Sequence, residues 1–202
     1  MPLSASLGMR DQTINDRPSV QTESDSRLLE RYQSGEHEAF KWLYERYKGR
    51  LYAYCFRLLR NGPDAEDAVH ETFLKLSIGL DSLRHAAAIR TWLYHVARNE
   101  SLMMMRRARG SPDIDPDTLW DDANPLQILT QKDTVRLVQH ALGEMKVEYR
   151  DVLVLREYDG MSYAEIAEIT GSTLDAVKSR IFKARKAMME KLRSQFNEGN
   201  DL

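Results

Sequence analysis

The chain has 202 residues, of which 42% are apolar and 30% are charged, so it can fill the core of one medium-sized domain or of two small ones. This composition excludes an intrinsically disordered chain. No apolar run approaches the roughly 18 residues that cross a bilayer, and residues 1–23 lack the apolar stretch of a signal peptide. We therefore expect a cytoplasmic protein without membrane insertion.

Charge is distributed unevenly along the chain, although the formal net charge is only −2. Residues 84–109 hold six arginines against one glutamate, and residues 172–193 hold seven bases against two acids. Between these blocks, residues 110–130 hold five aspartates and no base. The first basic block contains no lysine, and this favours phosphate recognition because a guanidinium can donate to phosphate through two N–H groups.

The first half of the chain is expected to be helical after a disordered tail at residues 1–24. Apolar residues recur every three or four positions from Phe40 to Leu58, which predicts a long helix that ends at Asn61-Gly62-Pro63. A second helix runs to about residue 80, and a third covers residues 89–107. The residues expected to point inward on the second helix are Ala65, Val69, Phe73 and Leu76.

The single cysteine, Cys55, lies in the first of these apolar stripes. One cysteine excludes an intramolecular disulfide and a multi-cysteine metal site. We expect a buried thiol rather than a redox sensor.

Prolines and aspartates separate the chain into two parts. Residues 109–130 contain Pro112, Pro116 and Pro125 together with the aspartates, so helical hydrogen bonds are lost and like charges repel. The predicted fold is all-α, with two small helical domains at 25–108 and 131–196 joined by a flexible acidic linker and followed by a tail at 197–202. No pattern typical of a strand and no internal repeat is present.

The second domain ends in the pattern of a helix-turn-helix. Val135, Val138, Leu142 and Met145 form one helix face, and another helix surrounds residues 149–153 and ends by Gly160. Ser162 and Glu165 form a capping box before a short helix at residues 163–170. Gly171 supplies a tight turn, and Ser172 begins a second start signal of the S-x-x-D kind. The residues expected to point inward on the following helix are Leu174, Val177, Ile181, Ala184, Met188 and Leu192.

In a helix-turn-helix the second helix enters the major groove with its N-terminal residues at the base edges. The residues expected to face DNA are Ser172, Thr173, Ala176, Ser179, Arg180 and Lys183. Those expected near phosphates are Lys178, Arg185 and Lys186.

Two longer segments together resemble a known family. YRDVLVLREYDGMSYAEIAEITGSTLDAVKSRIFKAR, at residues 149–185, resembles region four of bacterial sigma factors. DAEDAVHETFLKL, at residues 64–76, followed by TWLYHVARN at residues 91–99, resembles region two of the extracytoplasmic-function (ECF) subfamily. The resemblance extends over about residues 25–193.

The resemblance implies an RNA polymerase sigma factor that binds core polymerase, recognises the minus-ten and minus-thirty-five promoter elements, and takes part in DNA melting. The implied partners are the β′ clamp coiled coil and the β flap of the polymerase, promoter DNA and an anti-sigma factor; no cofactor is implied. The acidic face assigned to the polymerase comprises Asp64, Glu66, Asp67, His70 and Glu71. The residues assigned to minus-ten DNA are Arg84, His85, Arg90, His95, Arg98, Asn99 and Arg106, while the helix-turn-helix residues read the minus-thirty-five element. Independently of the family, His95, Arg98 or Asn99, Leu102 and Arg106 lie three or four positions apart on one helix face, which can follow a phosphate backbone.

Two other functional classes fit the sequence less well. An enzyme is disfavoured because His70-Glu71 starts like a zinc motif but has Leu74 in place of the second histidine, and because no phosphate-binding glycine loop is present. The remaining histidines, which are His37, His85, His95 and His140, are too scattered to indicate a metal site. A stand-alone helix-turn-helix repressor would bind duplex DNA without polymerase, and would have no use for the pattern at residues 64–107. Binding to DNA with and without core polymerase separates the three classes.

Overall fold

The computed structural model describes residues 23–79, 89–109 and 132–198. Every regular element in these ranges is a helix, which confirms the all-α prediction. The elements are α1 (Asp25–Gln33), α2 (Glu38–Leu59), α3 (Gly62–Gly79), α4 (Ile89–Arg109), α5 (Lys132–Gly143), α6 (Val147–Leu153), the π-helical turn η4 (Val154–Tyr158), α7 (Tyr163–Thr170) and α8 (Leu174–Glu198). The predicted linker and both outer tails lie outside the described residues, apart from their edges.

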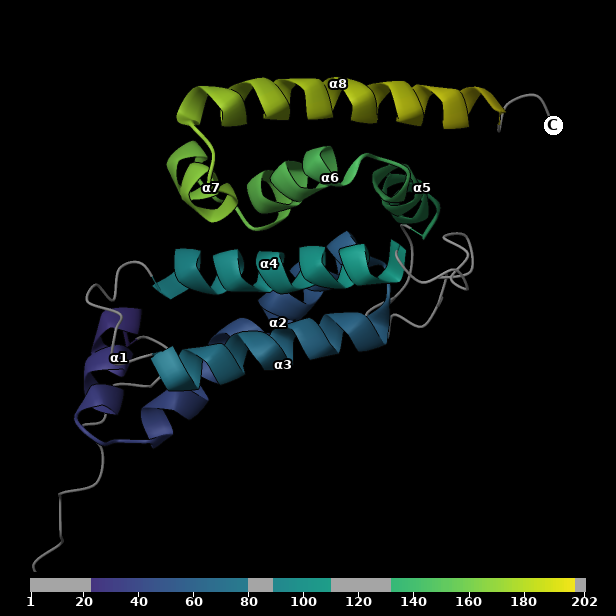
Figure 1. The fold of residues 1–202 in the computed structure, drawn as a ribbon. Coiled ribbons are helices and arrows are strands. Elements are labelled where there is room, and N and C mark those ends of the chain that lie inside the picture. Colours follow the sequence, from purple (N-terminus) through teal and green to yellow (C-terminus); the bar gives the residue numbers. More distant parts are fainter. Residues whose placement is uncertain (1–22, 80–88, 110–131, 199–202) are drawn as a thin grey trace, which may run out of the picture.

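The first domain is a bundle in which α2, α3 and α4 pack on one another and α1 packs on α2 (Figure 1). The apolar periodicity of the sequence identifies this core correctly, because Ala65, Val69, Phe73 and Leu76 are all buried. Cys55 is fully buried as predicted, and burial raises the pKa of its thiol to about 12. The thiol therefore stays protonated and unreactive at neutral pH.

The turn between α2 and α3 differs in detail from the prediction. Helix α2 ends before the asparagine and glycine, because Arg60 adopts the left-handed conformation with φ 61° and caps the helix. Asn61 instead begins the next helix, since its Oδ1 accepts a hydrogen bond from Asp64 N at 2.9 Å. Pro63 lies in the first turn of α3, where its missing N–H leaves no helical hydrogen bond unmade.

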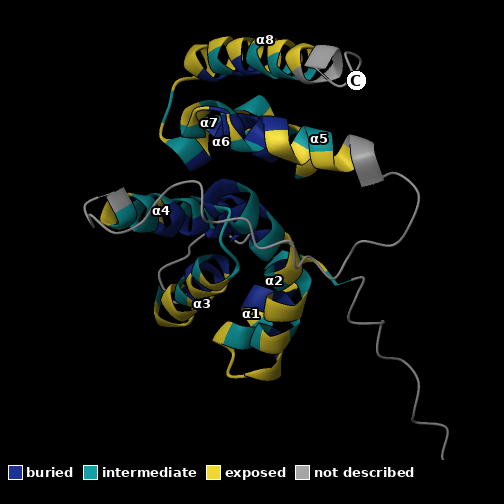
Figure 2. Ribbon diagram, turned by 90° about the vertical axis from the view of Figure 1, so that its right-hand side faces the viewer, coloured by how far each residue is buried: buried dark blue, intermediate teal, exposed yellow. Residues whose placement is uncertain are grey.

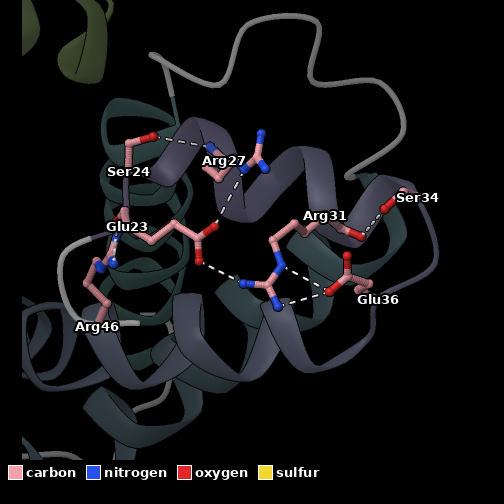
Figure 3. A network of polar contacts seen from close by, with 7 residues as sticks. All are labelled: Glu23, Ser24, Arg27, Arg31, Ser34, Glu36 and Arg46. Carbon is pink, nitrogen blue, oxygen red and sulfur yellow. Dashed lines mark hydrogen bonds and ion pairs between the residues drawn. The ribbon is translucent and has the colours of Figure 1, made fainter. Parts of the chain in front are cut away.

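A polar network holds the start of α1 against α2 (Figure 3). Ser24 caps α1 by accepting a hydrogen bond from Arg27 N, and Arg31 lies between the carboxylates of Glu23 and Glu36 at 2.7 and 2.9 Å. Arg46 of α2 donates to the backbone oxygen of Glu23 at 2.7 Å. Glu23 and Ser24, which the sequence assigned to the tail, are thus bonded to the domain.

The second domain packs α8 across α5, α6 and α7. Leu142 and Met145 are buried as expected, and so are Val177, Ile181 and Ala184 on α8. Two inward assignments are wrong, because Val135 and Leu174 are both 43% exposed. Leu174 is the first residue of its helix, so it lies beyond the core to which the later turns of α8 contribute.

The two domains lie against each other in a layered arrangement. Figure 1 shows α4 on one side of α5, α6 and α7, with α8 on their other side. The exposed residues of α8 therefore face away from the first domain (Figure 2). None of the described helices is both long enough and apolar enough to span a membrane.

Candidate DNA and polymerase interfaces

The helix-turn-helix is formed by α7, the turn at Gly171 and α8. The capping box is present, since Ser162 Oγ accepts from Glu165 N at 3.2 Å and Ser162 N donates to Glu165 Oε2 at 2.7 Å. Gly171 has φ 62°, a left-handed conformation that costs a glycine little, and this ends α7 abruptly. The predicted turn chemistry is therefore confirmed up to this point.

The start of α8 corrects one assignment. Thr173, rather than Ser172, caps the helix, because Ala176 N donates to Thr173 Oγ1 at 3.2 Å. Ser172 Oγ instead accepts a hydrogen bond from Arg180 Nη1 at 3.3 Å. This contact links the turn to the second turn of α8 and leaves both side chains half-buried.

The other residues assigned to the minus-thirty-five element are exposed at the cap of α8 and along the helix: Thr173, Ala176, Lys178, Ser179, Lys183, Arg185 and Lys186. Three of their basic groups form ion pairs at the surface. Lys178 lies 3.2 Å from Asp175, Arg185 lies 2.7 Å from Glu157, and Lys186 lies 3.9 Å from Glu190. Such exposed pairs contribute about 0–1 kcal/mol each, so phosphates can replace the carboxylates at little cost.

The acidic residues of α3 form a second exposed surface. Glu66, Asp67 and His70 are exposed, while Asp64 and Glu71 are half-buried, and their carboxylates form no ion pair with the residues that the structure describes. Two apolar side chains extend this surface by further helical turns, since Leu74 is 45% exposed and Ile78 is 76% exposed. Sequence patterns did not single out either residue, although both lie outside the inward stripe that ends at Leu76. We call Asp64, Glu66, Asp67, His70, Glu71, Leu74 and Ile78 the α3 surface.

The residues assigned to minus-ten DNA fall into three groups. Arg84 and His85 lie outside the described residues. Asn99 and Arg106 are exposed, as the spacing predicted. Arg90, His95 and Arg98 also lie outside the core of their own domain, but they are half-buried because the second domain covers them.

Polar contacts join this covered part of α4 to the second domain. Arg98 Nε donates to Asp151 Oδ2 at 2.6 Å, and Tyr54 Oη donates to Asp151 Oδ1 at 2.8 Å. Burial, followed by the charge of Asp151, raises the pKa of Tyr54 well above its usual range. Sequence patterns predicted no role for Tyr54 or Asp151.

A second carboxyl group of the second domain, that of Asp159, also bonds a side chain of α4. Tyr94 Oη donates to Asp159 Oδ1 at 2.7 Å, and Arg90 donates to the backbone oxygen of Asp159 and lies 3.5 Å from Glu165. Burial raises the pKa of Asp159 above its ordinary value. His95 Nδ1 lies 3.0 Å from the backbone oxygen of Ile169, at the end of α7.

Arg150 is a further residue that sequence patterns did not single out. Its buried guanidinium donates to four backbone carbonyls, those of Leu142, Gly143 and Met145 in its own domain and that of Leu58 at the end of α2. Burial, and the charge of Arg60 to a smaller extent, lowers the pKa of Arg150 to about 10. Among the described residues no group of histidine, cysteine, aspartate or glutamate side chains is arranged to hold a metal ion.

Comparison with known proteins accounts for both halves of the chain. Residues 43–111 match the Sigma-70 region 2 family, and residues 136–188 match Sigma-70 region 4. The ECF RNA polymerase sigma-E factor of Escherichia coli K12 is 33% identical over 181 residues, which cover 84% of this chain and 94% of that protein. The chain belongs to the ECF sigma factors.

Other relatives agree with this assignment. The RNA polymerase sigma-H factor of Pseudomonas aeruginosa is 29% identical over 188 residues, covering 87% of this ECF sigma factor and 97% of the relative. Among solved structures, the sigma factor RpoE in complex with the anti-sigma factor NepR from Bartonella quintana matches with a TM-score of 0.64 and 25% identity, over 76% of this chain and 96% of that one. CnrH in complex with the cytosolic domain of CnrY matches with a TM-score of 0.65 and 24% identity, over 85% and 99% of the two chains, and supports the fold.

Proposed function

We propose that this ECF sigma factor binds core RNA polymerase and directs it to promoters by recognising the minus-ten and minus-thirty-five elements. The observation that carries the proposal is the outward-facing α8, which presents exposed basic and small polar residues directly after a helix-turn-helix turn. The proposal implies a transcription initiation factor that has no catalytic activity of its own, and a cytoplasmic protein, because transcription takes place there.

We assign polymerase binding to the α3 surface. Its uncompensated carboxylates suit a basic partner such as the β′ clamp coiled coil, and Leu74 and Ile78 supply apolar area beside them. The β flap is the proposed partner of the second domain. Control by an anti-sigma factor is supported by the similar sigma factor RpoE, which was solved in complex with the anti-sigma factor NepR.

The decisive experiment is a gel-shift titration of promoter fragments with core polymerase alone, with the chain alone, and with both. We expect a stable, sequence-dependent complex only when both are present. A duplex bound equally well by the chain alone would indicate a stand-alone repressor and contradict the proposal.

Two variants of α8 distinguish a residue that reads bases from a residue that contacts phosphate. We expect Arg180→Ala to cost about 1–3 kcal/mol on the cognate minus-thirty-five element and to relax preference at one or two base pairs, because Arg180 lies near the start of α8. Lys186 is further along and exposed, so Lys186→Ala should weaken binding to cognate and scrambled elements alike. It should also lower the slope of log affinity against log salt by about one unit.

These variants are measured in holoenzyme titrations at several salt concentrations. If Arg180→Ala lowers the affinity equally for cognate and scrambled DNA, Arg180 positions the helix and does not read a base. Specificity would then have to come from Ser172, Thr173, Ser179 or DNA shape.

A further inference from the structure

A hydroxyl group in the turn between α7 and α8 contacts one arginine of α8, and this inference rests on the base-reading role proposed above for that arginine. Ser172 Oγ accepts a hydrogen bond from Arg180 Nη1 at 3.3 Å. The two residues are eight positions apart, so the contact joins the turn to the second turn of the helix. A residue of the turn therefore restrains the direction of a side chain assigned to DNA.

The backbone of Ser172 is held from both sides. Ser172 N donates to the backbone oxygen of Ala167 at 2.9 Å, a hydrogen bond that closes the end of α7. The next residue, Thr173, caps α8, and its backbone oxygen accepts from Val177 N at 3.0 Å. Because the end of one helix and the start of the next fix its neighbours, Ser172 offers its hydroxyl at a defined place beside α8.

Arg180 differs from the neighbouring bases in the kind of group that it bonds. Lys178, Arg185 and Lys186 each pair with a carboxylate. Arg180 forms no ion pair with a residue that the structure describes, and its bond to Ser172 joins it to a neutral group. The residues three and four positions away on the helix, none of which is acidic, are Ala176, Val177, Lys183 and Ala184. The hydroxyl therefore orients the guanidinium without neutralising its charge.

An arginine reads a base best when the plane of its guanidinium is oriented. Two N–H groups must align with two acceptors on one base edge, as guanine N7 and O6 present them in the major groove. A guanidinium has five N–H donors, and Ser172 uses one of them in Arg180, so four remain for DNA. A free arginine side chain loses rotamer entropy when DNA fixes it, and a contact that exists before binding lowers this cost.

We propose that Ser172 is a positioning residue, which holds Arg180 in the direction needed to read a base pair of the minus-thirty-five element. Ser172 acts through the arginine and not through a base contact of its own. Its side chain is half-buried and its oxygen is bonded to Arg180, whereas the adjacent Thr173 is exposed. Loss of the hydroxyl therefore lowers discrimination at the base pair that Arg180 reads and leaves discrimination at the other base pairs unchanged.

Substitutions at Ser172 separate the effect of the hydroxyl from that of side-chain volume. Ser172→Thr keeps the hydroxyl, and Ser172→Val has nearly the same shape as threonine without it. Ser172→Ala removes the hydroxyl without added volume. The matched control is Thr170→Val, which removes a half-buried hydroxyl two positions earlier that bonds the backbone oxygen of Ile166 at 2.7 Å.

Base preference is measured with holoenzyme formed from core polymerase and each full-length variant. The holoenzyme selects from promoter fragments in which only the minus-thirty-five segment is randomised, and the bound and unbound pools are sequenced. The ratio of enrichments gives the preference at each base pair. The base pair whose preference falls most in Arg180→Ala is the one that Arg180 reads. Thermal unfolding followed by circular dichroism checks that each variant is folded.

We expect Ser172→Val and Ser172→Ala to lower the preference at that base pair by about three- to tenfold, because the hydrogen bond that orients the charged donor is lost. Ser172→Thr and Thr170→Val should keep the original preference. In the Arg180→Ala background, Ser172→Val should cause no further loss, because no guanidinium remains to be oriented.

Three outcomes would overturn the positioning role. The first is equal preference in Ser172→Thr and Ser172→Val, since the hydroxyl would then be irrelevant. The second is a similar loss at every base pair in Ser172→Val, as expected of a merely structural residue. The third is a further loss from Ser172→Val in the Arg180→Ala background, which would show that Ser172 contacts DNA itself.

Failure of the proposed function gives a different result. If the unaltered holoenzyme enriches no sequence in the randomised segment, recognition of the minus-thirty-five element is contradicted. If it enriches a sequence and Arg180→Ala enriches the same one equally, only base reading by Arg180, and with it the positioning role of Ser172, is overturned.

Discussion

Replacing Arg150 by methionine is expected to lower the free energy of unfolding by about 3–5 kcal/mol, because several buried carbonyl acceptors lose their donor at once. The guanidinium bonds the ends of α2 and α5 and the turn before α6, so its loss affects both domains and their junction. For a chain of this size each kcal/mol corresponds to roughly 2–4 °C in the unfolding midpoint. Thermal and urea unfolding followed by circular dichroism measure the change.

Two further variants make the test specific. Arg150→Lys retains the charge but supplies fewer donors in a different geometry, so an intermediate loss is expected. Arg136→Met removes an exposed arginine from α5 and should change stability by less than about 0.5 kcal/mol. If Arg150→Met lowers the free energy of unfolding by less than about 1 kcal/mol, water must donate hydrogen bonds to the carbonyls in place of Arg150.

The second large effect concerns polymerase binding by the α3 surface. Asp64→Lys with Asp67→Lys is expected to weaken affinity for core polymerase by about 10–100-fold, since like charges placed against a basic partner cost several kcal/mol. Both residues lie outside the buried stripe of α3, so the fold should persist. Affinity is measured by fluorescence anisotropy of labelled chain titrated with core polymerase.

The matched control carries the same change of charge elsewhere on the first domain. Glu30→Lys with Glu38→Lys uses two exposed acids, of which Glu38 occupies the first turn of α2 as Asp64 occupies the first turn of α3. Equal weakening by both pairs would show that total charge, rather than the α3 surface, controls the affinity.

Sequence patterns predicted the parts of this fold that depend on near neighbours in the chain. The stripe from Ala65 to Leu76, the capping box at Ser162 and the left-handed turn at Gly171 each follow from residues within a few positions. The cap at Thr173 was missed because Ser172 and Thr173 offer similar hydroxyl groups one position apart. In the structure Thr173 caps α8, whereas Ser172 bonds the more distant Arg180.

The contacts between the domains could not be predicted in this way. Tyr54 and Asp151 are 97 residues apart, and Arg150 and Leu58 are 92 apart. Both Tyr54 and Asp151 lie in helices whose periodicity reports only that a side chain points inward. Periodicity carries no information on which polar group of a distant helix such a side chain meets. The outward stripe on α4 was identified correctly, but its coverage by the second domain was not.

The long sequence separation of these contacts means that they form late during synthesis of the chain. All four helices of the first domain are complete at Arg109, whereas Ile169, whose backbone oxygen meets His95, follows about 60 residues later. At roughly 5–20 residues per second, a ribosome needs about 3–12 s to make that stretch. The basic face of α4 is therefore uncovered on every newly made chain for seconds, long enough for a nearby anionic partner to bind before the second domain exists.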